Sequence, residues 1–159
     1  MSVSDDLKRR ALDRISNCTN PRELRTTAEN ADRLGHNDIA RAAYRKLYSV
    51  LPQAEPGTLE FDVWQSIYAL EGTLKEERGK TILLARTRQK IGREGEVATV
   101  ADLITRPASE GYRMLVDRNM PELSFEAVAL RHPAKFDAAV IRAATDRLVG
   151  SGFNPEAFS

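Results

Sequence analysis

The sequence feature that most constrains the fold is a stretch of apolar residues at helical spacing between positions 59 and 74. The main apolar residues are four, four, three and four positions apart: Leu59, Val63, Ile67, Leu70 and Leu74. This spacing places them on one face of an α-helix, and Phe61, Trp64 and Tyr68 widen that face. A helix with so little polar circumference must pack against several others. We therefore expect a central helix in which Trp64 and Ile67 are largely buried.

The rest of the chain has the pattern of shorter helices separated by breakers. No segment alternates apolar and polar residues over a strand length, and no Asn-Gly or Asp-Gly dipeptide marks a hairpin. The predicted fold class is all-α, with about eight short-to-medium helices in a compact bundle of helical hairpins. One hairpin is sharply defined. Asn20-Pro21 begins its first helix, Gly35 ends it with positive φ, and Asn37-Asp38 begins the second.

Residues 52–58 form the clearest interruption, with two prolines and one glycine in seven positions. This loop predicts an N-terminal helical hairpin region over residues 1–52. The central long helix and a C-terminal helical bundle then occupy residues 53–159. The alternative is one domain spanning residues 1–159, because a chain of this length can also bury a single core.

Composition excludes several classes of protein. The formal net charge is +1, so any nucleic-acid surface must be a local patch. The single Cys18 excludes an intramolecular disulfide framework and fits a reducing compartment. No apolar run is long enough to span a membrane, and the N-terminus lacks a signal-peptide pattern. We expect a cytoplasmic protein with no membrane partner.

Catalytic, cofactor and metal motifs are not recognisable. Gly79-Lys80-Thr81 matches only the end of a phosphate-binding loop, because Leu74 stands where the first glycine is needed. His36 and His132 are far apart in sequence, and each lies beside a helix breaker. We expect no catalytic residue, no metal and no cofactor, and the sequence favours a protein that is not an enzyme.

The strongest functional signal is the basic segment, residues 78–93, which contains six cations and no acid. These are Arg78, Lys80, Arg86, Arg88, Lys90 and Arg93. A helix is predicted over residues 82–93, and it places Arg86, Lys90 and Arg93 on a stripe away from its apolar side. The leading hypothesis is a non-catalytic binding protein that contacts DNA or RNA through these six residues. The competing interpretation is a solvated face neutralised by nearby acids.

Two further functions stay open. The chain is a protein–protein interaction module or a self-associating module if apolar surface remains on the central helix or on the hairpin around Gly35. It is an enzyme if an active site is assembled only in three dimensions.

Overall fold

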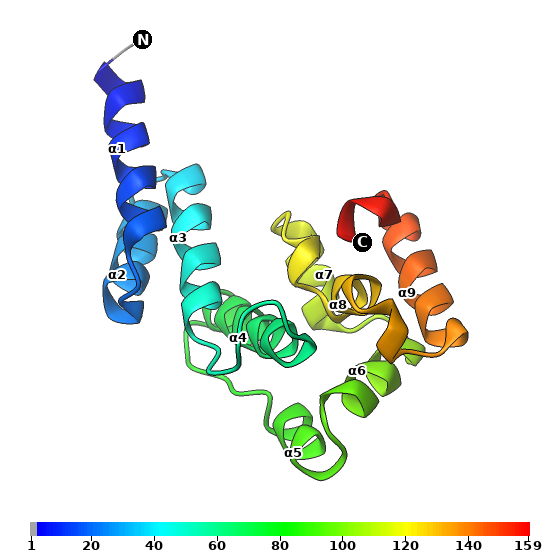
Figure 1. Ribbon diagram of the computed structural model, residues 1–159. Helices are drawn as coiled ribbons and strands as arrows, with labels where there is room; N and C mark the ends of the chain where they lie inside the picture. The colour runs from blue at the N-terminus through cyan, green and yellow to red at the C-terminus, as the bar shows by residue number, and fades with distance from the viewer. Residues whose placement is uncertain (1–2) are drawn as a thin grey trace. The chain divides into compact units, whose positions relative to one another are not determined.

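The computed structural model describes residues 3–159, and these residues are all-α (Figure 1). They form nine α-helices and three short 3-10 helices, without a strand in the described part of the chain. The all-α prediction with about eight helices is therefore confirmed. The chain divides into two compact units: unit 1, Met1–Pro52, and unit 2, Gln53–Ser159.

Unit 1 consists of α1 (Val3–Asn17), α2 (Pro21–Arg33) and α3 (Asn37–Val50). Helix α3 packs against both α2 and α1, as Figure 1 shows. Four buried alanines line the two hairpin helices, two on each: Ala28, Ala31, Ala40 and Ala43. Because a methyl group is the smallest side chain that fills space, these positions allow the two backbones to approach closely.

The hairpin of unit 1 has the local chemistry that the sequence predicts at its start and at its turn. The Asn20 side chain accepts hydrogen bonds from the backbone N–H groups of Arg22 and Glu23 and so caps α2. Gly35 has a φ of +81°, as predicted. Helix α3 begins at Asn37, also as predicted, and the His36 side chain before it forms no capping hydrogen bond.

Unit 2 contains six α-helices and three 3-10 helices. Their bounds are α4 (Leu59–Arg78), α5 (Ala85–Glu94), α6 (Glu96–Thr105), α7 (Glu110–Asp117), η1 (Pro121–Leu123), α8 (Phe125–Arg131), η2 (Pro133–Lys135), α9 (Ala138–Gly150) and η3 (Pro155–Phe158). Helix α4 packs against α6, α7, α8 and η1, which accounts for its wide apolar face. The Thr58 hydroxyl accepts from the Phe61 N–H at its start, and Gly79 ends it with a φ of +70°.

Burial in unit 2 differs from the sequence prediction in one respect. Ile67 is fully buried, as expected, but Trp64 is only partly buried. The helix that is buried around its whole circumference is the short α8, in which every residue from Phe125 to Leu130 is inaccessible to solvent or nearly so. It contacts α4, α6 and α9, and Figure 1 shows α8 and α9 side by side.

Helix α5 begins later than predicted. The sequence favours a helix over residues 82–93, whereas α5 spans Ala85–Glu94 and follows a non-helical connection. At the observed start the Leu84 N–H donates to the Glu71 carboxylate at 2.8 Å, so a side chain of α4 accepts from one of the N–H groups that a helix start leaves without a partner. Lys80 lies on the connection between α4 and α5.

Candidate binding site

The basic segment does not present six equivalent cations. Arg78 lies in the last turn of α4, Lys80 lies on the connection, and the other four residues lie on α5. Acidic side chains from other parts of unit 2 approach several of them. What each cation contacts decides how much of the segment can bind an external anion.

Arg88 is part of the internal structure of unit 2. Its Nε and Nη2 donate to the two oxygens of Glu71 at 2.8 and 2.7 Å. The guanidinium lies over the rings of Trp64 and Tyr68, 5.3 and 5.6 Å from their centroids. The hydrogen bonds with Glu71 raise the pKa of Arg88 above its usual value. This side chain connects α5 to α4. Its cation–π contact also covers one face of the Trp64 ring, in place of an apolar side chain.

Lys90 is also held by acids of unit 2. Its Nζ lies 2.9 Å from Asp102 of α6 and 3.5 Å from Glu94 of α5. The hydrogen bond with Asp102 raises the pKa of Lys90 and lowers the pKa of Asp102. The predicted stripe is therefore not uniform, because Lys90 is directed to α6 while Arg86 is exposed.

The remaining four cations of the basic segment are more accessible. Arg78 pairs with Glu110 of α7 at 2.8 Å, and Arg93 lies 4.0 Å from Glu94. Lys80 and Arg86 are exposed and form no ion pair with any residue in the described range 3–159. The sequence could not show this division, because Asp102 and Glu110 are close to the segment only in the folded chain.

The second feature of unit 2 is an apolar cavity of about 430 Å³. Helices α4, α6, α7, α8 and α9 and the start of α5 contribute to it. The apolar part of the lining consists of Leu70, Leu74, Ile82, Leu84, Leu103, Pro107, Tyr112, Leu115 and Phe125. No local motif marks this cavity, because its walls come from segments that are distant in the sequence.

Gly111 sets the spacing of one cavity wall. A Cβ atom at this position would lie 2.7 Å from Cδ2 of Leu70, which is closer than real carbon atoms approach. The absence of a side chain therefore lets the first turn of α7 lie directly against α4. A glycine inside a helix is otherwise unfavourable by about 1 kcal/mol relative to alanine. This glycine is the one local sequence signal that could have pointed to the cavity.

A buried ion pair forms one side of the cavity. Arg147 Nη1 lies 2.5 Å from Oε2 of Glu126, a residue of α8 with almost no exposed surface. The Arg147 guanidinium lies 5.9 Å from the ring centroid of Tyr112. The Tyr112 hydroxyl donates to the Arg147 carbonyl and lies 2.8 Å from the Ser151 hydroxyl. Burial raises the pKa of Tyr112. These contacts fix α7, α8 and α9 around the apolar space.

Two other arginines line the cavity and remain accessible. The Arg78 side chain is 45% exposed and uses Nη2 for its ion pair with Glu110. The Arg106 side chain is 64% exposed and uses Nη2 for its ion pair with Asp102 at 3.0 Å. A guanidinium has five N–H donors, so both side chains keep donors for a further acceptor.

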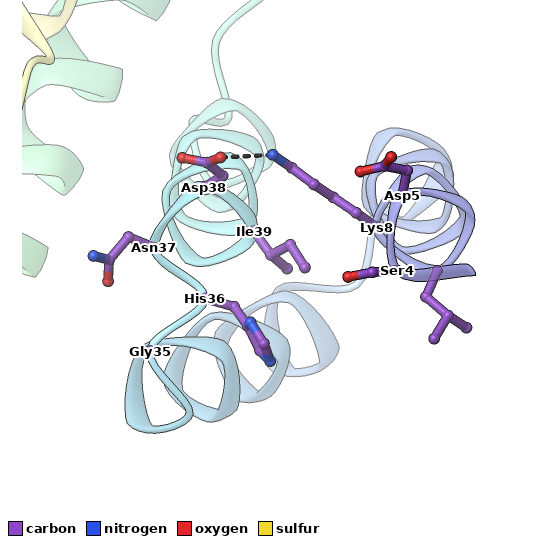
Figure 2. Close-up of a pocket in the computed structure, with 9 residues that line it drawn as sticks. Ser4, Asp5, Lys8, Gly35, His36, Asn37, Asp38 and Ile39 are labelled. Atoms are coloured by element: carbon purple, nitrogen blue, oxygen red, sulfur yellow. Dashed lines mark hydrogen bonds and ion pairs between the residues drawn. The ribbon is translucent and has the colours of Figure 1, made fainter. Parts of the chain in front are cut away.

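Unit 1 has a hollow of its own, which Figure 2 shows between α1 and the start of α3. Its volume is about 530 Å³. Lys8 reaches from α1 to Asp38 across this hollow at 2.6 Å, and both side chains are largely exposed. Exposed ion pairs of this kind contribute little binding or stability. The hollow therefore has less of the character of a ligand site than the more apolar cavity of unit 2.

Metal and catalytic groups do not gather in the part of the chain that the structure describes. No cluster of three or more His, Cys, Asp or Glu side chains with metal-site geometry occurs in residues 3–159. His132 Nε2 lies 2.7 Å from Asp62, which also accepts from Arg131 at 3.2 Å. These contacts join the end of α8 to the first turn of α4. None of the described helices combines the length and the apolar character needed to cross a membrane.

Comparison of the chain with protein-family models, with curated proteins and with solved structures finds no match.

Proposed function

We propose that this chain is a non-catalytic helical binding protein whose binding surface is the apolar cavity of unit 2. The observation that carries the proposal is the cavity itself, about 430 Å³ of space with mainly apolar walls and a few polar groups. Ligand sites in proteins commonly have volumes of roughly 300–1,000 Å³ and the same kind of lining. The buried pair Glu126–Arg147 supports the proposal, because it holds the surrounding helices in place without occupying the cavity.

The interaction-module hypothesis is compatible with this site. Its occupant is then an apolar side chain from a protein partner or from a second copy of the chain. For the compartment we propose the cytoplasm, because the lone Cys18 is a free thiol and a reducing environment preserves it.

Nucleic-acid contact through the basic segment is a second proposal, and Lys80 and Arg86 support it. Both are exposed and lack an acidic partner among the described residues. The other four residues named from the sequence already have acidic neighbours, so fewer of their N–H donors are available to a phosphate. Replacing Lys80 and Arg86 together by Gln is expected to reduce the salt dependence of DNA or RNA affinity by about two units. A wild-type protein without salt-sensitive binding at low ionic strength would contradict this second proposal.

A neutral fluorescent probe tests the cavity directly. N-phenyl-1-naphthylamine is expected to increase in fluorescence when it binds the full chain, because its apolar rings leave water. Thr87 lines the cavity from α5, so Thr87→Trp is expected to fill part of the space and weaken probe binding about tenfold. Gln89→Trp, two positions along the same helix and outside the lining, is the matched control and should bind like the wild type.

Two results would contradict the proposed site. One is the absence of any fluorescence change with the wild-type chain. The other is equal weakening by Thr87→Trp and Gln89→Trp, which would show that the probe responds to the helix surface and not to the cavity.

A further inference from the structure

We propose that the cavity of unit 2 takes a small amphipathic molecule with an apolar body and one carboxylate. This inference rests on the proposed function and adds the chemical class of the ligand. Its basis is the position of two accessible arginines, Arg78 and Arg106, in the lining of a space that is otherwise mainly apolar.

The apolar body of the ligand lies against the aliphatic and aromatic walls. Leu70 and Leu74 of α4 face the space from one element, and Leu115 and Phe125 face it from α7 and α8. These four are the buried part of the lining, and its accessible apolar surface comes from Ile82, Leu84, Leu103 and Pro107. A ligand body placed against them leaves water, which favours binding in proportion to the apolar area that is covered.

The head group of the ligand meets the guanidinium groups of Arg78 and Arg106. Each arginine uses only Nη2 in its ion pair, with Glu110 and Asp102 respectively. The Nε–H and Nη1 donors of both side chains have no partner among the described residues. A guanidinium donates to both oxygens of a carboxylate in a planar, bidentate arrangement. The two arginines therefore provide a recognition element that an alcohol or an amine cannot satisfy in the same way.

The charges of the lining favour an anion over a cation. The lining contains three arginines, Arg78, Arg106 and Arg147, and two acids, Glu110 and Glu126. Glu126 is buried and bound to Arg147, so the accessible part of the lining has two arginines and one acid. Asp102 partly offsets Arg106 from outside the lining, but it also pairs with Lys90. Each accessible arginine thus has one acidic partner, and it is the N–H donors left over on both guanidinium groups that match a single carboxylate.

Three ligands with the same chain length separate the two parts of this proposal. Octanoate, n-octanol and octylammonium have the same apolar body and differ in the charge of the head group. Isothermal titration calorimetry of the full chain is expected to give about tenfold tighter binding for octanoate than for octanol, the scale of one charge-assisted hydrogen-bond arrangement. Octylammonium is expected to bind more weakly than octanol.

Variants of the two arginines identify the head-group site. Replacing Arg78 and Arg106 together by Gln should weaken octanoate about tenfold, to the level of octanol, and leave octanol binding unchanged. The matched control replaces Arg113 and Arg142 by Gln. Both are exposed arginines of unit 2 outside the lining, and the control should keep the wild-type affinities.

The outcomes distinguish the inference from the proposed function. Equal affinities for all three ligands, tighter binding of octylammonium, or an unchanged preference for octanoate in the Arg78/Arg106 variant would overturn the carboxylate site and leave the apolar cavity. Absence of binding by all three ligands would overturn the proposed function itself.

Discussion

The basic segment and the apolar cavity of unit 2 differ in how far their side chains are already engaged inside the fold. In the segment, Arg88 and Lys90 contact acids of α4 and α6 and have become part of the internal structure. In the cavity, apolar side chains from α4, α6, α7 and α8 surround a space that none of them fills. A run of cations in the sequence is therefore not by itself a surface that is available to bind an anion. Available binding capacity is what remains after the neighbouring helices have packed.

The largest expected effect concerns Arg88, a residue of the basic segment that contacts acids inside unit 2. Arg88→Ala should destabilise the chain by about 2–4 kcal/mol, because it leaves the nearly buried Glu71 carboxylate without its cation and removes the contact with Trp64. Arg86→Ala, on the same helix, removes an exposed side chain without an ion pair and should change stability by less than about 0.5 kcal/mol. Urea denaturation of both variants measures the difference in the free energy of unfolding. Equal losses of stability would mean that the contacts of Arg88 with Glu71 and Trp64 do not stabilise the fold.

The second prediction changes the wall of the cavity. Gly111→Val should destabilise unit 2 by about 1–2 kcal/mol, because the new side chain forces the buried Leu70 side chain to rearrange. Gly92→Val is the matched control, since a Cβ at Gly92 meets nothing within 4 Å. Thermal unfolding compares the two. A stable Gly111→Val variant with normal probe binding would show that the close contact between α4 and α7 does not shape the cavity.

The third prediction concerns the hydrogen bonds of the Tyr112 hydroxyl, which connect α7 to the end of α9. Tyr112→Phe removes the hydroxyl that donates to the Arg147 carbonyl and contacts Ser151. The expected loss of stability is about 1 kcal/mol, the usual net value of one such bond. The ring and its contact with the Arg147 guanidinium remain, so the affinity for a neutral probe should change little. A large loss of affinity would instead assign the hydroxyl to the ligand site.

The smallest expected effect is the pH dependence of the ion pair between Lys90 and Asp102. The pKa of Asp102 is lowered in the folded chain, mainly by its hydrogen bond with Lys90, from an ordinary value of 3.8. The stabilisation is therefore present above pH 3.8 and is lost as pH falls through the lower folded value. Lys90→Gln should make the loss of stability on acidification below pH 3.8 less steep, as measured by urea denaturation across that range. An unchanged acid profile would argue against this pairing.

The starts of α2, α4, α7 and α8 follow from local sequence, because each has a capping side chain. Thr58, Ser109 and Ser124 each accept a hydrogen bond from the backbone N–H three residues later. The predicted start of α5 is wrong, and the partner of the Leu84 N–H at the observed start is Glu71, thirteen positions earlier. A contact of that range depends on the tertiary fold and leaves no local pattern.

The candidate site was less accessible to sequence reasoning than the fold. The six basic residues are visible in the sequence, but the acids Asp102 and Glu110 that engage two of them come from α6 and α7. The periodic pattern correctly identifies Leu70 and Leu74 as inward-facing. It cannot show whether the apolar face of a helix packs tightly against the neighbouring helices or leaves a cavity between them. That distinction depends on how α7 and α8 pack against α4.

The most direct test of the account is a map of where an apolar ligand contacts the full chain in solution. Methyl resonances recorded by NMR during a titration with n-octanol are expected to shift at Leu70, Leu74 and Leu115, which line the cavity. The methyl groups of Leu24 and Leu47, buried residues of unit 1, should remain unchanged. Saturable shifts confined to the cavity would support it as the binding surface. Shifts confined to unit 1, or an absence of saturable shifts in the cavity, would contradict the account.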